Sequence, residues 1–181
     1  MKRFGLALVL LACAMISTGC VSRAIKEGVG VAFGPKGVSV PIQPIAENMA
    51  GKYYVFQVEP FADETPSGVP QIVKDTLAPQ VQQKMAEFYD SRKILPQTGA
   101  ESLTIRGSFI YYEDANNTTD QVFGPFEELL ARVRLYSGRR LVGEAYCVGR
   151  STESVNKGPE KKAQGLAKAI VNWIATAYPK P

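Results

Sequence analysis

Six acidic side chains stand in three adjacent pairs along the chain, and paired carboxylates can perform acid–base hydrolysis. The pairs are Asp63 with Glu64, Glu113 with Asp114, and Glu127 with Glu128. A glycosidase needs two carboxyl groups that face each other about 5 to 10 Å apart. Neighbouring residues of a strand point to opposite faces of the sheet, so no adjacent pair supplies this geometry alone. A carboxylate-based hydrolase therefore requires members of two pairs to converge, and it stays an alternative.

Other catalytic chemistry is restricted by composition, because the sequence contains no histidine. Ser-His-Asp and Cys-His catalysis and histidine zinc sites are thereby excluded. The glycines of "GVGVAFG" are spaced GxGxxxG, which differs from the GxGxxG of dinucleotide-binding loops. We therefore predict no catalytic residues, no metal and no cofactor, and expect a protein that is not an enzyme.

The N-terminal segment has the order of a secretory signal. Lys2 and Arg3 precede an uncharged stretch from Phe4 to Ile16, and small residues follow at 17–19. The apolar stretch is shorter than the about 20 residues that a membrane-spanning helix needs. We predict an export signal over residues 1–19.

The end of this segment, "STGC", resembles the lipobox of bacterial lipoproteins, in which the signal is cut before a cysteine whose thiol is then acylated. Gly19 and Cys20 match the pattern, and Ser17 stands where Leu is usual. The resemblance implies cleavage between Gly19 and Cys20 and a palmitate-type lipid anchor on Cys20. Val21 follows where Asp would favour the inner membrane, so the implied location is the outer membrane, facing the periplasm. Cleavage after Ala14 and an uncleaved leader stay open as alternatives.

Lipidation would leave Cys147 as the one unmodified thiol of the mature chain, since Cys13 departs with the signal. No intramolecular disulfide is then possible, and we expect Cys147 to be buried as a small apolar group. The formal net charge is +4, and adjacent basic pairs such as Arg139-Arg140 and Lys161-Lys162 are typical of solvated turns and helix starts. We therefore predict no nucleic-acid partner.

The domain organisation follows from composition. Residues 20–51 have the character of a lipidated tether, within which residues 28–42 alternate apolar side chains around a Gly34-Pro35-Lys36-Gly37 turn and predict a hairpin. Residues 52–181 are predicted to form a single α+β periplasmic domain.

Hydrophobic periodicity gives the elements of this domain. "YYVFQVEPF" indicates a strand, and the apolar residues between Val69 and Phe88 recur at helical steps, with Pro79 expected to bend this helix or mark its first turn. Residues 101–114 alternate as a strand, and residues 126–151 predict a hairpin that places Arg132 and Arg134 on one face with Glu144. Pro159 opens a last helix with Trp173 on its apolar side. The predicted fold is α+β, a mainly antiparallel sheet in the order strand-helix-strand-strand-strand-helix with the helices packed on one face.

Residues 52–178 are similar, in "VFQVEPFADET" and in the element order, to small bacterial lipoproteins whose domain resembles the N-terminal module of TolB and curli-secretion-component proteins. Auxiliary lipoproteins of ABC-type lipid transporters share a similar order. The resemblance implies an uncharacterised envelope lipoprotein, and neither family supplies catalytic residues to this chain.

The predicted function is a membrane-anchored, non-enzymatic binding or assembly module of the cell envelope. The alternative is an accessory lipoprotein of a lipid or small-molecule transporter. We expect the membrane, through the lipid on Cys20, and an envelope protein as partners. The loops "ADETPSG" and "EDANNTTDQVFGPFEE" are the candidate contact surfaces. Their candidate contact residues are Asp63, Glu64, Asp114, Asn116, Asn117 and Phe123.

Overall fold

The computed structural model describes residues 35–46, 53–94, 101–113, 127–151 and 158–178. These residues form the strands β1 (Lys36–Gln43), β2 (Tyr53–Val58), β3 (Ala62–Asp63), β4 (Glu101–Tyr112), β5 (Glu127–Ser137) and β6 (Arg140–Ser151), and the helices α2 (Gln71–Arg92) and α4 (Pro159–Ala175). The predicted signal, the Gly19-Cys20 junction and the loop residues Asp114, Asn116, Asn117 and Phe123 lie outside the described residues.

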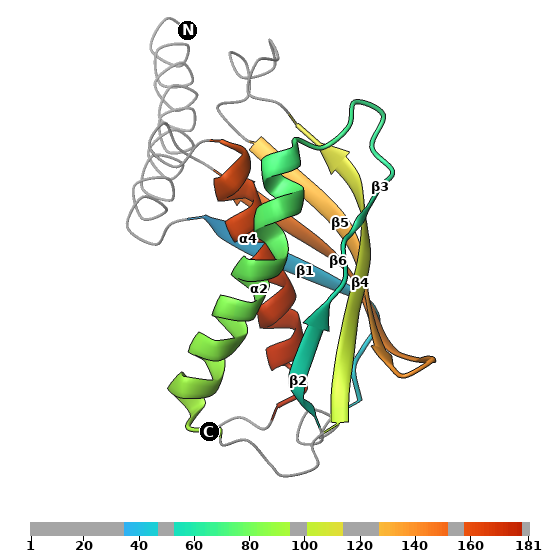
Figure 1. The fold of residues 1–181 in the computed structure, drawn as a ribbon, viewed down its shortest axis with the longest axis vertical. Coiled ribbons are helices and arrows are strands. Elements are labelled where there is room, and N and C mark those ends of the chain that lie inside the picture. Colours follow the sequence, from blue (N-terminus) through green and yellow to red (C-terminus); the bar gives the residue numbers. More distant parts are fainter. Residues whose placement is uncertain (1–34, 47–52, 95–100, 114–126, 152–157, 179–181) are drawn as a thin grey trace, which may run out of the picture.

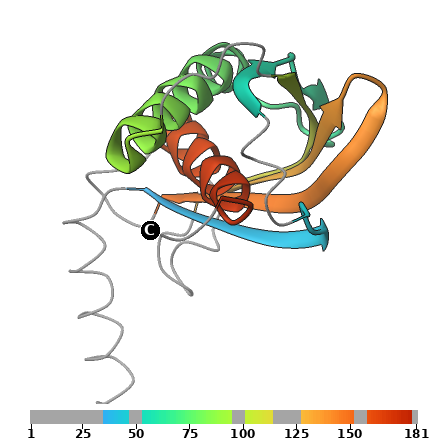
Figure 2. The ribbon, with the colours of Figure 1, turned by 90° about the horizontal axis from the view of Figure 1, so that it is seen from below.

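The strands form one sheet in the order β1-β6-β5-β4-β2, with β3 also paired to β4 (Figure 1). The pairs β1/β6, β6/β5 and β5/β4 are antiparallel, and β2 and β3 run parallel to β4. Both helices cover the same side of the sheet (Figure 2). The predicted α+β class with helices on one face is confirmed.

The pairing of strand β1 in the structure differs from the hairpin that the sequence pattern predicted. Its partner is β6, more than 100 residues away, with Val38 opposite Val148 and Val40 opposite Tyr146. The predicted hairpin would have paired this strand with residues 29–33, which lie outside the described residues. The predicted tether over residues 20–51 thus includes a strand that belongs to the sheet.

Helix α2 buries a stripe of side chains spaced four residues apart, which is the apolar face of an amphipathic helix. The stripe is made of Val73, Leu77, Val81, Met85 and Tyr89. The first-turn alternative for Pro79 is wrong, because the helix begins at Gln71 and Pro79 lies in its interior. Ile72, one of the apolar residues whose helical spacing predicted a single face, is instead exposed.

Helix α4 begins with Pro159 at its first turn, as predicted, and buries Trp173. The expectation that Lys161 and Lys162 are both solvated is wrong for Lys162. Its side chain is buried, its ammonium lies 4.2 Å from the ring centroid of Tyr112, and its Nζ donates a hydrogen bond to the carbonyl oxygen of Glu113. These contacts satisfy the buried charge and fix the start of α4 against the end of β4.

Glycines let α4 approach the sheet closely. A Cβ on Gly149 of β6 would overlap the backbone of Lys162 and Leu166, and one on Gly37 of β1 would overlap that of Gly165 and Ala169. These two close approaches show which side of each strand faces the helices, because the Cβ positions of Gly37 and Gly149 are directed toward α4. None of the helices in the described part of the chain has the length and apolar character needed to span a bilayer.

Candidate functional site

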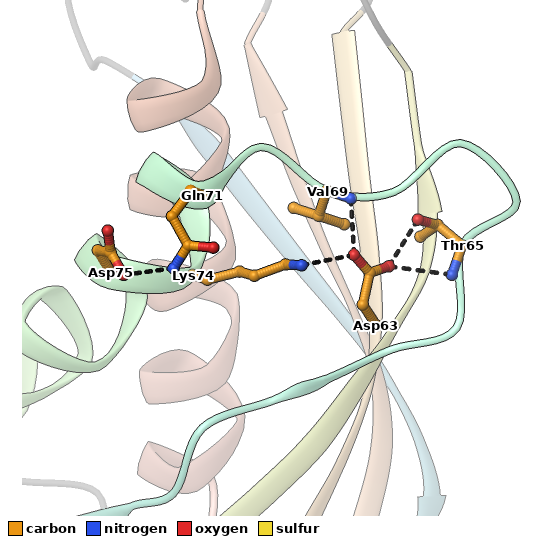
Figure 3. A network of polar contacts seen from close by, with 6 residues as sticks. All are labelled: Asp63, Thr65, Val69, Gln71, Lys74 and Asp75. Carbon is orange, nitrogen blue, oxygen red and sulfur yellow. Dashed lines mark hydrogen bonds and ion pairs between the residues drawn. The ribbon is translucent and has the colours of Figure 1, made fainter.

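Asp63, the first of the predicted contact residues, is held inside its own loop (Figure 3). One carboxylate oxygen accepts hydrogen bonds from the backbone N–H and the hydroxyl of Thr65, at 3.2 and 2.7 Å. The other accepts from the Val69 N–H at 2.8 Å and pairs with the Lys74 ammonium at 2.8 Å. The Lys74 contact, followed by the Val69 and Thr65 hydrogen bonds, holds the pKa of Asp63 well below its usual range. Asp63 therefore braces the connection between β3 and α2.

Glu64 points away from this brace. Its backbone N–H donates to the carbonyl oxygen of Phe109 at 2.9 Å, which continues the pairing of β3 with β4. Its negative charge contributes to raising the pKa of Arg132, after the larger contribution of Glu144. The side chains of Asp63 and Glu64 thus point to opposite faces of the sheet, as expected for adjacent residues of an extended segment.

The structure brings together members of two acidic pairs at one end of the sheet. The Glu113 N–H donates to the Glu128 carbonyl oxygen at 3.0 Å, and the charges of both residues help raise the pKa of Tyr111, after desolvation by burial. The Glu128 carboxylate is bonded to Arg150 at 2.6 Å. In the described part of the chain, His, Cys, Asp and Glu form no group of three that could hold a metal ion.

Cys147 has the environment of a structural residue. It lies on the side of β6 that faces the helices and is fully buried, which confirms the expectation. Burial raises the pKa of its thiol to about 12. Since the thiolate is the reactive form, this cysteine is unsuited to nucleophilic chemistry.

Neither α2 nor α4, the helices of the described part of the chain, covers the opposite face of the sheet, and we call this face the open face. Since successive side chains alternate across a strand, the residues beside Gly37 and Gly149 point to this face. Cross-strand pairing aligns four of its side chains in one row across β1, β6, β5 and β4: Val38, Val148, Leu130 and Tyr111. Val40 and Tyr146 lie beside this row.

A cluster of charged side chains from β6, β5 and β4 lies on the open face. The Glu144 carboxylate accepts hydrogen bonds from Arg132 Nε at 2.7 Å and Arg134 Nε at 2.6 Å, and its side chain is only 10% exposed. The hydrogen bond from Arg132 is the largest influence lowering the pKa of Glu144. Further along β4, Arg106 pairs with Glu59 at 2.8 Å. The predicted placement of Arg132 and Arg134 with Glu144 is confirmed.

Strand β1 exposes three large aliphatic side chains, of which Val38 and Val40 point to the open face. Val38 is 48%, Val40 57% and Ile42 45% exposed. We call these three side chains the β1 stripe. The alternation of Val38, Val40 and Ile42 marked this strand in the sequence, but pattern alone could not show that α4 covers its other side.

Grooves lie along α2 in the described part of the chain. One of about 380 Å³ is lined by Lys84, Phe88 and Lys168 among others, from α2 and α4. Another, of about 300 Å³, lies beside β2 and is lined by Phe56, Met85 and Tyr89 among others. These two reach only the lower end of the size range of small-molecule sites, and a third, of about 190 Å³ between α2 and the start of α4, is smaller still.

The fold and its surfaces define an α+β protein with one helix-covered and one open sheet face. No protein-family model matches the chain, and no curated protein matches it in sequence. Among solved structures, the PelC dodecamer from Paraburkholderia phytofirmans is 14% identical, with 77% of this chain and 97% of that chain covered and a TM-score of 0.43. A variant of that dodecamer in another crystal form is 15% identical, with 76% and 96% covered and a TM-score of 0.45.

Proposed function

We propose that this protein is a lipoprotein of the bacterial envelope that acts as a non-enzymatic binding or assembly module in the periplasm. The open face is the observation that carries this proposal. Exposed apolar side chains gathered on one face and bordered by charged groups are the usual signature of an interaction surface. The lipid on Cys20 would hold this surface at the outer membrane.

The use of the carboxylates supports binding over hydrolysis. Asp63 braces its loop, Glu144 bridges two arginines, and Glu128 pairs with Arg150. A hydrolase would need two such groups directed at a substrate across a cleft. These three carboxylates instead serve the structure of the sheet and its loops.

The β5–β4 half of the open face is the proposed contact area for an envelope protein. Tyr111 is 45% exposed there, and Arg132 offers a cation beside it. Tyrosine and arginine are enriched at protein interfaces because they combine apolar area with hydrogen-bonding groups. Glu64, the predicted contact residue whose charge reaches Arg132, would border this area.

Photo-crosslinking in living cells tests the contact area. A benzoylphenylalanine in place of Tyr111 keeps an aromatic side chain on the open face, and the same residue in place of Gln83 on α2 is the matched control. We expect an adduct with an envelope protein from position 111 and not from position 83. The absence of an adduct at 111, or identical adducts from both positions, would contradict the proposal.

Cell fractionation tests the anchor. Cys20→Ser should accumulate as an unprocessed precursor without acyl chains, whereas Cys13→Ser, which changes a cysteine of the predicted signal, should be processed and membrane-bound like the wild type. If both variants behave as the wild type, Cys20 is not the site of attachment.

A further inference from the structure

The side chains of the β1 stripe are exposed to solvent, on a strand whose opposite side packs against α4. The Gly37 position faces Gly165 and Ala169 of α4, so Val38 and Val40 point to the open face, where they are 48% and 57% exposed. Ile42 is exposed at the end of the strand, beside the register shift between Pro41 and Gln43. Three large aliphatic side chains on one edge strand form a surface that water solvates poorly.

The edge of β1 itself is poorly suited to receive another strand. Pro41 lacks an N–H, and proline is tolerated in an edge strand where that missing donor would face away from the sheet. A strand added alongside β1 would find a gap in the row of donors at this position. The stripe is therefore better suited to contact through its side chains, against a partner that needs no strand pairing.

The chain length between the anchor and the stripe limits what can cover it. Cys20 precedes Lys36, the first residue of β1, by 16 residues, which span at most about 55 Å when fully extended. Of the described elements, β1 is the first to follow the anchor along the chain. A tether of this kind holds the stripe near the bilayer at a millimolar effective concentration, so even a weak surface affinity is sufficient for docking.

The charges beside the stripe match a phospholipid surface. Lys36 is exposed at the start of β1, two residues before Val38, and its cross-strand partner is Arg150. Arg150 forms an ion pair with Glu128. Within the described residues, Lys36 forms no ion pair with an acidic side chain. Tyr146 and Val148 stand on the neighbouring strand, and tyrosine is favoured where apolar and polar layers meet.

We propose that the β1 stripe is a membrane-docking surface, in which Val38, Val40 and Ile42 enter the headgroup boundary of a phospholipid bilayer while Lys36 lies beside lipid phosphates. The inference rests on the proposed lipid anchor. Apolar groups of peripheral proteins enter this boundary by about 5 to 10 Å. The contact area around Tyr111 lies on the same face of the sheet, three strand spacings, about 14 Å, from β1.

Depth-dependent quenching tests the docking in the full-length lipoprotein, reconstituted in vesicles of phosphatidylethanolamine and phosphatidylglycerol. An environment-sensitive fluorophore is attached to Val40→Cys, with Gln83→Cys on α2 as the matched control. Cys147 is buried and does not compete for the label. Nitroxide-bearing acyl chains should quench the probe at position 40 several-fold more than the probe at position 83. Equal and weak quenching at both positions would overturn the proposal.

Two further measurements distinguish membrane docking from self-association and from the loss of the anchor. If the probe at position 40 is shielded equally in detergent without phospholipid, and Val40→Cys copies form disulfide-linked dimers, the stripe covers a second copy and the membrane proposal is wrong. The mass of the purified protein reports acylation independently. Acylated protein without quenching at position 40 refutes docking alone, and unacylated protein refutes the proposed anchor and the docking that rests on it.

Discussion

The carboxylate of Asp63 lies 2.8 Å from the ammonium of Lys74, and this ion pair joins the end of β3 to the first turn of α2. Helix α2 has no side-chain hydrogen bond at its N-cap, Pro70. The Asp63 network, which also binds the Val69 N–H, therefore supplies the polar contacts that fix where this helix begins. A residue predicted to contact a partner is thus part of the scaffold.

Replacement of Asp63 by Ala should destabilise the fold. The change removes an ion pair and three hydrogen bonds to Thr65 and Val69, and losses of this kind cost about 1–3 kcal/mol. Lys74→Ala removes the ion pair alone and should cost less. Urea unfolding measures both. Equal stability of Asp63→Ala and the wild type would show that the loop does not depend on this carboxylate.

Asp63 should also make stability depend on pH. Its pKa is lowered in the folded state, so the unfolded chain binds a proton first, and the free energy of unfolding should fall as pH drops below about 4. Glu144 acts in the same direction. The test is the difference between the wild type and Asp63→Asn, which should shrink as pH falls through this range. A difference that is constant from pH 6 to pH 3 would contradict the assignment.

The glycine contact between β6 and α4 should tolerate no side chain. In Gly149→Ala the new Cβ overlaps backbone atoms of Lys162 and Leu166, which cannot rotate away, and overpacking of this kind costs about 1–3 kcal/mol. Gly138→Ala is the matched control, because its Cβ meets nothing within 4 Å and only its φ of +59° is unfavourable, at about 1 kcal/mol. Thermal unfolding should rank Gly149→Ala below Gly138→Ala, and the reverse order would contradict the packing.

Cys147 should be unreactive until the protein unfolds. Burial raises the pKa of its thiol to about 12, so at pH 8 a thiol reagent meets a protonated and inaccessible sulfur. Modification by such a reagent should become fast only in denaturing urea. Rapid modification of the folded protein at pH 8 would show that β6 opens or that the thiol is exposed.

Sequence periodicity correctly predicted the helices and strands whose residue patterns lie within one short segment of the chain. The stripes of α2 and α4 repeat within each helix, and the β5–β6 hairpin contains its own turn, so Glu144 could be placed beside Arg132 and Arg134 in advance. Strand β1 differs because its partner β6 is remote in sequence, and the same alternation fits a local hairpin equally well. Only the fold shows that α4 covers one side of β1 and leaves the other open.

The candidate site was less predictable than the fold for a related reason. The sequence marks Asp63 as a polar loop residue, but its partner Lys74 lies in the first turn of a separate element, the helix α2. The same holds for Lys162, whose burial depends on the position of Tyr112 at the end of β4. Polar residues become structural through contacts that only the tertiary arrangement creates.

The mass of the N-terminal peptide of the mature protein, purified from membranes, tests the central claim most directly. We predict a peptide that begins at Cys20 and carries a diacylglyceryl thioether and an amide-linked acyl chain. A peptide that begins at Met1, or one in which Cys20 has a free thiol, would contradict the account of a lipid-anchored envelope protein.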